Sequence, residues 1–162
     1  MEVGVHQRVP RGWGSPAAGR RLPRLLIEDD DPVAAVSDFT VFRDAGFDVA
    51  FCSGPGADPK KCPLRRGEPC SLVAGSDVVL HVLPPTLGIA PEIRRRHPFI
   101  PVVTAAPRGH GDSAGATGGL AGGGGAGDIS LAGTDLPVSA SLEAQVRALR
   151  EALARANIRS GR

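Results

Sequence analysis

The chain has 162 residues, which is enough for one folded domain with irregular extensions. Its 19 Lys and Arg residues nearly balance its 17 Asp and Glu residues, and only 4% of its residues are aromatic, so its composition argues against a nucleic-acid-binding protein. No apolar run approaches the roughly 20 residues that span a bilayer, which argues against a membrane protein. The odd number of cysteines, 3, favours a reducing cytoplasm over a secreted disulfide framework.

The first predicted strand follows a basic segment rich in Gly and Pro, residues 1–21, which we interpret as a disordered tail. Residues 25–27 form a short apolar run that is typical of a buried strand, and an acidic run follows it. Asp31 is a favourable N-cap and Pro32 a favourable first helical residue. The helix that they start is predicted to end just before Gly46, because glycine readily adopts the left-handed conformation of a helix C-terminus.

The next part of the chain has two predicted strands around an irregular stretch. Residues 48–52 are predicted as the second strand. Residues 77–83 form a nearly all-apolar run, typical of a parallel strand that is buried on both faces. Between them, residues 53–76 contain four prolines and four glycines. Because proline removes a backbone donor, no regular helix is expected there beyond one short turn at residues 71–74.

A short helix, a fourth strand and a glycine-rich insert come next. Residues 89–97 are predicted as a helix, because its arginines lie toward the C-terminal end, where cations suit the helix dipole. Residues 100–104 are predicted as the fourth strand. Residues 109–127 contain ten glycines and no lysine, which indicates a flexible insert and not a phosphate-binding loop.

The last elements complete an alternation of strands and helices. A fifth strand is predicted around residues 136–138. Ser141 is predicted to cap a final helix with an apolar stripe of Leu142, Val146, Leu149, Leu153 and Ala156. This alternation predicts an α/β domain, residues 22–157, with a doubly wound parallel sheet in a three-layer sandwich. Residues 158–162 are predicted as a short tail.

In order and spacing, these elements resemble the receiver domain of response regulators, the CheY-like fold. The acidic run 28–31 after the first strand carries part of the likeness, as does the apolar run 77–80 followed by Pro84. The segment 97–105 and the Leu136-Pro137 pair before the last helix carry the rest. The resemblance implies a flavodoxin-like sheet and a role in two-component-like signal transduction.

The resemblance also implies a phosphoryl-transfer pocket, in which an acidic pair holds magnesium and a hydroxyl and a lysine hold phosphoryl oxygens. Glu28 with Asp29, or Asp29 with Asp30, matches the acidic pair, and Thr104 matches the switch hydroxyl. The acidic run has two interpretations from the residues alone. It is either a solvated turn that needs no ligand or a Mg²⁺ or Ca²⁺ site, since hard cations prefer oxygen ligands.

Two residues that this chemistry needs are missing. The phosphoacceptor position falls at His81 or Val82, and neither is a carboxylate. Leu136 stands where the family has a lysine. The resemblance therefore implies a pseudo-receiver that has no catalytic residues and accepts no phosphoryl group.

The cysteines are the second concentration of reactive side chains. Cys52, Cys62 and Cys70 have the spacing C-x9-C-x7-C, and His81 follows. Cys52 ends one predicted strand and His81 lies near the end of the strand expected beside it, so both are expected at the same edge of the sheet. Three thiolates and an imidazole would suit tetrahedral zinc, but the sequence lacks a C-x2-C pair. A Cys62–Cys70 disulfide and inert thiols are the other two interpretations.

The sequence therefore predicts a regulatory module without enzymatic activity that acts in the cytoplasm by protein–protein interaction, with another protein or a second copy as partner. No cofactor is required, although magnesium or zinc stays open. One alternative is a metal- or redox-sensing module that uses the cysteines. A second is a Rossmann-like enzyme, which the acidic residues after the first strand disfavour because they would repel a pyrophosphate.

Overall fold

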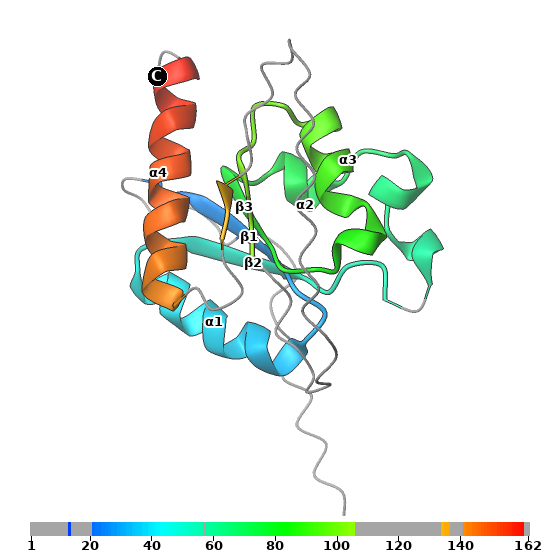
Figure 1. Ribbon diagram of the computed structural model, residues 1–162, viewed down its shortest axis with the longest axis horizontal. Coiled ribbons are helices and arrows are strands. Elements are labelled where there is room, and N and C mark those ends of the chain that lie inside the picture. The colour runs from blue at the N-terminus through cyan, green and yellow to red at the C-terminus, as the bar shows by residue number, and fades with distance from the viewer. Residues whose placement is uncertain (1–12, 14–20, 57, 106–133, 137–140, 161–162) are drawn as a thin grey trace, which may run out of the picture.

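A computed structural model describes residues 13, 21–56, 58–105, 134–136 and 141–160. The described residues form strands β1 Arg24–Glu28, β2 Asp48–Cys52, β3 Val78–His81, β4 Val102–Thr104 and β5 Thr134–Asp135 (Figure 1). They also form helices α1 Pro32–Asp44, α2 Ser71–Ala74, α3 Ile89–Arg96 and α4 Leu142–Ser160. Three short 3₁₀ turns are η1 Pro59–Lys61, η2 Leu64–Arg66 and η3 Pro85–Leu87.

The five strands form one parallel sheet in the order β2-β1-β3-β4-β5. This is the order of flavodoxin-like doubly wound sheets. Helices α1 and α4 pack on one face, and α2 and α3 pack on the other (Figure 1). The predicted fold class, a doubly wound parallel sheet in a three-layer α/β sandwich, is confirmed.

Helix α1 begins and ends at the residues that the sequence predicts. The Asp31 carboxylate accepts hydrogen bonds from the backbone N–H groups of Val33 (2.9 Å) and Ala34 (3.2 Å), and Pro32 follows as the first helical residue. Gly46, with φ of +89°, reverses the chain after the helix. The cap places α1 directly beyond the end of β1, beside the acidic run.

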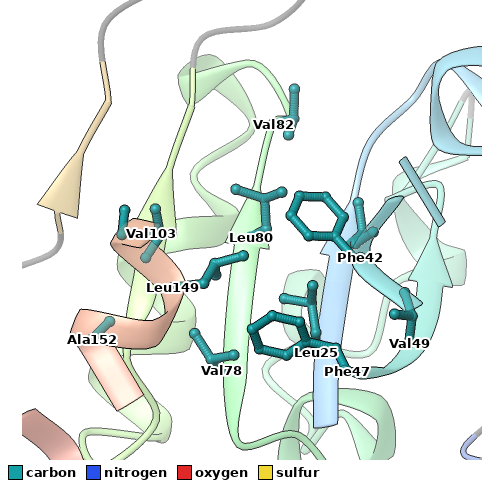
Figure 2. Close-up of a cluster of buried hydrophobic side chains, with 12 residues drawn as sticks. Leu25, Phe42, Phe47, Val49, Val78, Leu80, Val82, Val103, Leu149 and Ala152 are labelled. Atoms are coloured by element: carbon teal, nitrogen blue, oxygen red, sulfur yellow. The ribbon is translucent and has the colours of Figure 1, made fainter. Parts of the chain in front are cut away.

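The core on the α1 and α4 side is a continuous apolar cluster (Figure 2). Leu25 of β1, Leu80 of β3 and Leu149 of α4 are fully buried in it. The rings of Phe42 and Phe47 meet edge to face, with centroids 6.4 Å apart. Since burying a large apolar side chain contributes roughly 1.5–3 kcal/mol, this cluster holds α4 on the sheet.

The opposite core explains how the irregular segment 53–76 stays folded. Leu64 of η2 and Val73 of α2 are buried in a second apolar cluster with Leu83. At Gly54, where φ is +71°, an added Cβ would lie only 2.8 Å from a methyl carbon of Leu83. The predicted single helical turn at 71–74 is confirmed as α2, and the rest of the segment follows the surface of this cluster.

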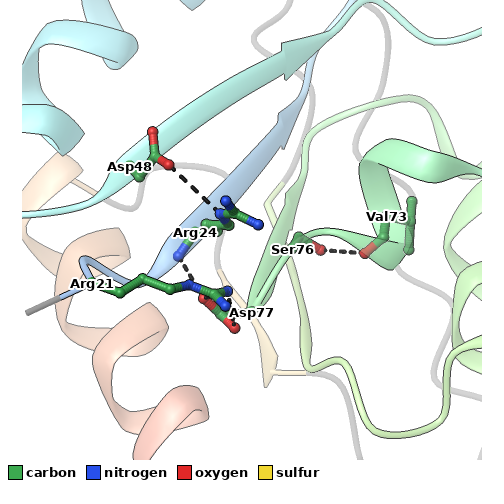
Figure 3. A network of polar contacts seen from close by, with 6 residues as sticks. All are labelled: Arg21, Arg24, Asp48, Val73, Ser76 and Asp77. Atoms are coloured by element: carbon green, nitrogen blue, oxygen red, sulfur yellow. Dashed lines mark hydrogen bonds and ion pairs between the residues drawn. The ribbon is translucent and has the colours of Figure 1, made fainter. Parts of the chain in front are cut away.

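The amino ends of three strands are joined by a polar network (Figure 3). The Asp77 carboxylate, just before β3, accepts the backbone N–H of Arg24 at 2.8 Å and both hydrogen bonds of the Arg21 guanidinium at 2.9 and 3.0 Å. Nε of Arg24 also lies 3.7 Å from Oδ2 of Asp48 in β2. Trp13 packs against the second cluster, and the Arg24 guanidinium lies over its ring. Two residues of the predicted tail 1–21, Trp13 and Arg21, therefore contact the domain.

The fifth strand and the last helix have other bounds in the structure than the sequence predicts. The fifth strand is Thr134–Asp135, two residues before the predicted start, and α4 continues to Ser160, so residues 158–160 are helical and not tail. Val33, in the first turn of α1, is 77% exposed. The glycine-rich segment 109–127 lies outside the described residues. None of the described helices is long and apolar enough to cross a membrane.

The position of Leu149 gives a direct test of this packing. We expect Leu149→Asp to lower the free energy of unfolding by roughly 3 kcal/mol or more, because it places an unpaired charge in the core. Ala154→Asp, on the exposed side of the same helix, is the control and should cost less than about 1 kcal/mol. Urea unfolding followed by circular dichroism measures both. Equal losses would contradict the packing of α4.

Candidate functional site

The carboxyl edge of the sheet carries a row of polar residues in register. Glu28, the last residue of β1, pairs with Cys52 of β2 on one side and with His81 of β3 on the other. His81 pairs in turn with Thr104 of β4. Neighbours in register on parallel strands point to the same face, so these four side chains emerge on the side of α2 and α3.

Glu28 and His81 form a buried hydrogen-bonded pair at the centre of this row. Nδ1 of His81 lies 2.7 Å from Oε2 of Glu28, and each residue is only 3% exposed. The contact is compatible with an ionised Glu28 that accepts a hydrogen bond from the protonated Nδ1 of His81. Burying either group without the other would leave an uncompensated polar or charged group, so the pair acts as a unit.

The backbone fixes this pair in place. The Val82 N–H donates to the Glu28 carbonyl at 2.8 Å, and the Ala105 N–H donates to the His81 carbonyl at 2.9 Å. These bonds continue the ladders of β1, β3 and β4 one residue past the strands. Nε2 of His81, the other ring nitrogen, is buried and has no hydrogen-bond partner among the described residues.

The side chains of the three residues of the predicted acidic pocket lie in different environments. Glu28 faces His81, as described. Asp29 is 2% exposed; its N–H donates to the Cys52 carbonyl at 3.1 Å, and its Oδ1 accepts from the Asp31 N–H at 2.9 Å. Asp30 is exposed to solvent. The acidic run is therefore mainly the turn between β1 and α1, with one carboxylate committed to the sheet.

The predicted phosphoacceptor positions are both closed. His81 is engaged by Glu28, and Val82 is 3% exposed with its side chain in the first apolar cluster. Leu136 is packed against the same cluster, and its N–H donates to the Thr104 carbonyl at 2.8 Å. The structure thus brings Thr104 and His81 side by side and places Val82 and Leu136 at the first apolar cluster.

The receiver resemblance implies magnesium at this edge, and the residues present do not fit it. Such a site needs several carboxylate oxygens around one point. Here the Glu28 side chain is hydrogen-bonded to a ring nitrogen of His81, and the Asp29 carboxylate accepts from the backbone of the following turn. Val82, at one of the two predicted phosphoacceptor positions, has no side-chain oxygen. Among the residues that the structure describes, no group of three or more His, Cys, Asp and Glu side chains is arranged to hold a metal ion.

The three cysteines lie on the same side of the sheet as this row, the side covered by α2 and α3. Cys52, Cys62 and Cys70 are half-buried free thiols packed against the second apolar cluster. Burial is the main reason that the pKa of Cys52 rises to about 11, although the Gly54 N–H, 3.4 Å from its sulfur, opposes the shift. With no metal bound, the Cys52 thiol is therefore protonated at neutral pH and a weak nucleophile.

Several solved structures have a similar fold. A receiver domain protein from Clostridium thermocellum superposes with a TM-score of 0.53 at 18% identity, over 85% of this chain and 98% of that one. A CheY-like receiver from Methanospirillum hungatei JF-1 gives 0.54 at 13% identity, over 85% and 98%. The signal receiver domain of an HD domain-containing protein from Pseudomonas fluorescens Pf-5 gives 0.54 at 16%, over 91% and 98%.

The chain has the receiver fold. At these identities the likeness establishes the fold alone. No protein-family model and no curated protein sequence matches the chain. The resemblance seen in the sequence is thus confirmed as a resemblance of fold, across nearly the whole length of each receiver domain compared.

The Glu28–His81 pair is the feature that sequence reasoning missed. The acidic run and His81 were both predicted to lie at the carboxyl edge, in the same pocket, but no contact between Glu28 and His81 was predicted. Glu28 follows the apolar run of β1 and His81 interrupts the apolar run of β3, on strands that the receiver order makes neighbours. Two polar residues at matching positions of adjacent buried strands are the signal that would have predicted the pair.

The coupling of this pair can be measured. We expect Glu28→Leu and His81→Leu each to lower the free energy of unfolding by roughly 3 kcal/mol, because each leaves one buried polar partner unpaired. The double variant should lose much less than the sum of the two, since an apolar pair of similar volume replaces both groups. Denaturant unfolding of the four proteins gives the interaction energy. Additive losses would show that the two side chains do not interact.

Proposed function

We propose that this chain is a receiver-like regulatory module that accepts no phosphoryl group and acts by binding another protein in the cytoplasm. The receiver fold supports the regulatory role. The observation that carries the proposal is the closed end of β3, where His81 is paired with Glu28 and Val82 lies in the core. A site built in this way has no reactive group to offer a phosphodonor.

The chemistry of phosphoryl acceptance explains why. Formation of an acyl phosphate needs a carboxylate oxygen that attacks phosphorus, and positive groups that neutralise the charge developing on the phosphoryl oxygens. Val82 supplies no oxygen and Leu136 no positive charge. The His81 ring is 4% exposed, so a phosphodonor in solution cannot reach its nitrogens. Thr104 supplies the hydroxyl group that the receiver resemblance implies for this pocket.

Protein binding is the function that remains for such a domain, and two surface features support it. Phe99, after α3, is 82% exposed, and Val33, at the start of α1, is 77% exposed. A protein bound over either position would remove apolar surface from water, which favours association. In this proposal the domain has no enzymatic activity, and the signal that it carries depends on which protein it binds.

Treatment with acetyl phosphate and Mg²⁺ tests the proposal. We expect no phosphoryl group on the intact protein by mass spectrometry and no hydroxylamine-sensitive label, because no carboxylate is available at the end of β3. A receiver domain that retains its phosphoacceptor Asp, treated in parallel, is the positive control. A stoichiometric acyl phosphate on any residue near Val82 would overturn the proposal.

A further inference from the structure

The loop between β2 and α2 carries two thiols whose surroundings differ from those of Cys52. Cys62 lies between η1 and η2, and Cys70 is the N-cap residue of α2. Both thiols are free and half-buried against the second apolar cluster. Cys52 lies at the end of a strand beside Glu28, where burial raises the pKa of its thiol. Because exchange with a disulfide requires a thiolate, the two loop thiols are better placed to react than Cys52.

A tight turn brings the two loop thiols toward one another. The Glu68 N–H donates to the Pro63 carbonyl at 2.8 Å. Cys62 directly precedes one end of this hydrogen bond, and Cys70 lies two residues beyond the other. Both thiols are also near enough to the Cys52 thiol to add to the rise of its pKa, so the three side chains share one region of the second cluster. The turn therefore makes Cys62 and Cys70 a natural disulfide pair.

The surroundings of Cys62 are positively charged. Four exposed cationic side chains flank it in the chain: Lys60, Lys61, Arg65 and Arg66. With the two carboxylates of Asp58 and Glu68, these four cations leave residues 58–68 with a net charge of +2. The Arg66 guanidinium is held by both oxygens of Glu68, at 2.6 and 2.9 Å, and is close enough to Cys62 to interact with it electrostatically. An anion that approaches Cys62 is attracted by this charge.

The turn that separates the two thiols is attached to the α3 side of the domain. Leu64 of η2 is buried in the second cluster, and the Arg65 guanidinium donates to the Leu87 carbonyl of η3 at 2.8 Å. Turn η2 also contacts α3, beside which it lies in Figure 1. A covalent bond between the two ends of this turn would therefore change the surface that η2 and α3 present together, while the sheet stays as it is.

We propose that Cys62 and Cys70 form a redox-responsive pair that reacts with small anionic disulfides, of which glutathione disulfide is the example. The Cys62 thiolate attacks one sulfur of glutathione disulfide, the S–S bond breaks, and the leaving glutathione thiolate takes up the proton that Cys62 gave up. The Cys70 thiolate then attacks the Cys62 sulfur, and the second glutathione leaves in the same way. Two protein thiols are oxidised to one disulfide, and one glutathione disulfide is reduced to two glutathiones.

This inference goes beyond the regulatory function proposed above and does not depend on it. The thiols lie in the loop before α2, and their exchange involves no group at the end of β3. A chain that accepts a phosphoryl group would leave the thiol chemistry unchanged, and a chain without reactive thiols would leave the absence of phosphoryl acceptance unchanged. The two proposals therefore fail separately.

Peptide mapping of the full chain after treatment with glutathione disulfide tests the pair. Trypsin cuts after Lys and Arg, so each cysteine falls on its own peptide, with residues 44–60, 62–65 and 67–94. Without reduction, we expect peptide 62–65 to be linked to peptide 67–94. Cys70→Ser should stop with glutathione on Cys62, and Cys62→Ser should react at least about tenfold more slowly than the parent.

The matched control is Cys52→Ser, which should form the same linked peptides as the parent. Circular dichroism of each reduced variant checks that the domain is folded before oxidation. A link to peptide 44–60, a parent that stops with glutathione on Cys62, or a parent that does not react at all would each overturn the proposal.

The rate of oxidation tests the role of the positive charge. At low salt we expect Arg66→Gln to slow the reaction with glutathione disulfide at least about twofold, because this disulfide is an anion at neutral pH. Hydroxyethyl disulfide, which is neutral, should oxidise the parent and Arg66→Gln at equal rates. Arg95→Gln removes an exposed arginine that is likewise paired with a glutamate, and should change neither rate. Equal rates for the parent and Arg66→Gln with glutathione disulfide would overturn the preference for an anionic disulfide.

Discussion

The buried pair of Glu28 and His81 is the constraint on which the carboxyl edge of this protein depends. The pair lies across β1 and β3, the two central strands on which every other part of the sheet is assembled. Its two groups can be buried only together, since either one alone would cost several kcal/mol in the interior. The register that joins them also fixes Thr104 and Cys52 beside them and turns Val82 into the opposite core.

In our proposal, this constraint explains how a receiver fold can keep its shape without receiver chemistry. The fold needs parallel strands in register and apolar layers on both faces, and those requirements are met here. Phosphoryl transfer needs in addition a carboxylate, a metal and a cation at one point of the edge. Here the only fully buried carboxylate–imidazole pair among the described residues connects two strands, and the acidic run serves as the turn and N-cap of α1.

Much of the fold could be predicted because its signals are local. Asp31, Pro32 and Gly46 mark α1, and the prolines of residues 53–76 exclude a regular helix. Other features depend on which face of an element meets the sheet, and there the sequence was less informative. In α1, Ala35, Asp38 and Phe42 are buried while Val33 is exposed, because these three residues share the face of the helix that docks on the sheet. The Glu28–His81 contact joins residues 53 positions apart, and its prediction requires the strand order and register together.

The central claim is that this edge of the sheet is closed to a phosphoryl group, and NMR spectroscopy tests it most directly. The ¹H–¹⁵N spectrum of the labelled protein would be recorded during titration with Mg²⁺ and beryllofluoride, a mimic of the phosphoryl group. The account predicts that the amide signals of Asp29, Asp30 and Thr104 stay in place throughout the titration. Saturable shifts of these three signals would contradict it, because they would show an intact phosphoryl site at the end of β3.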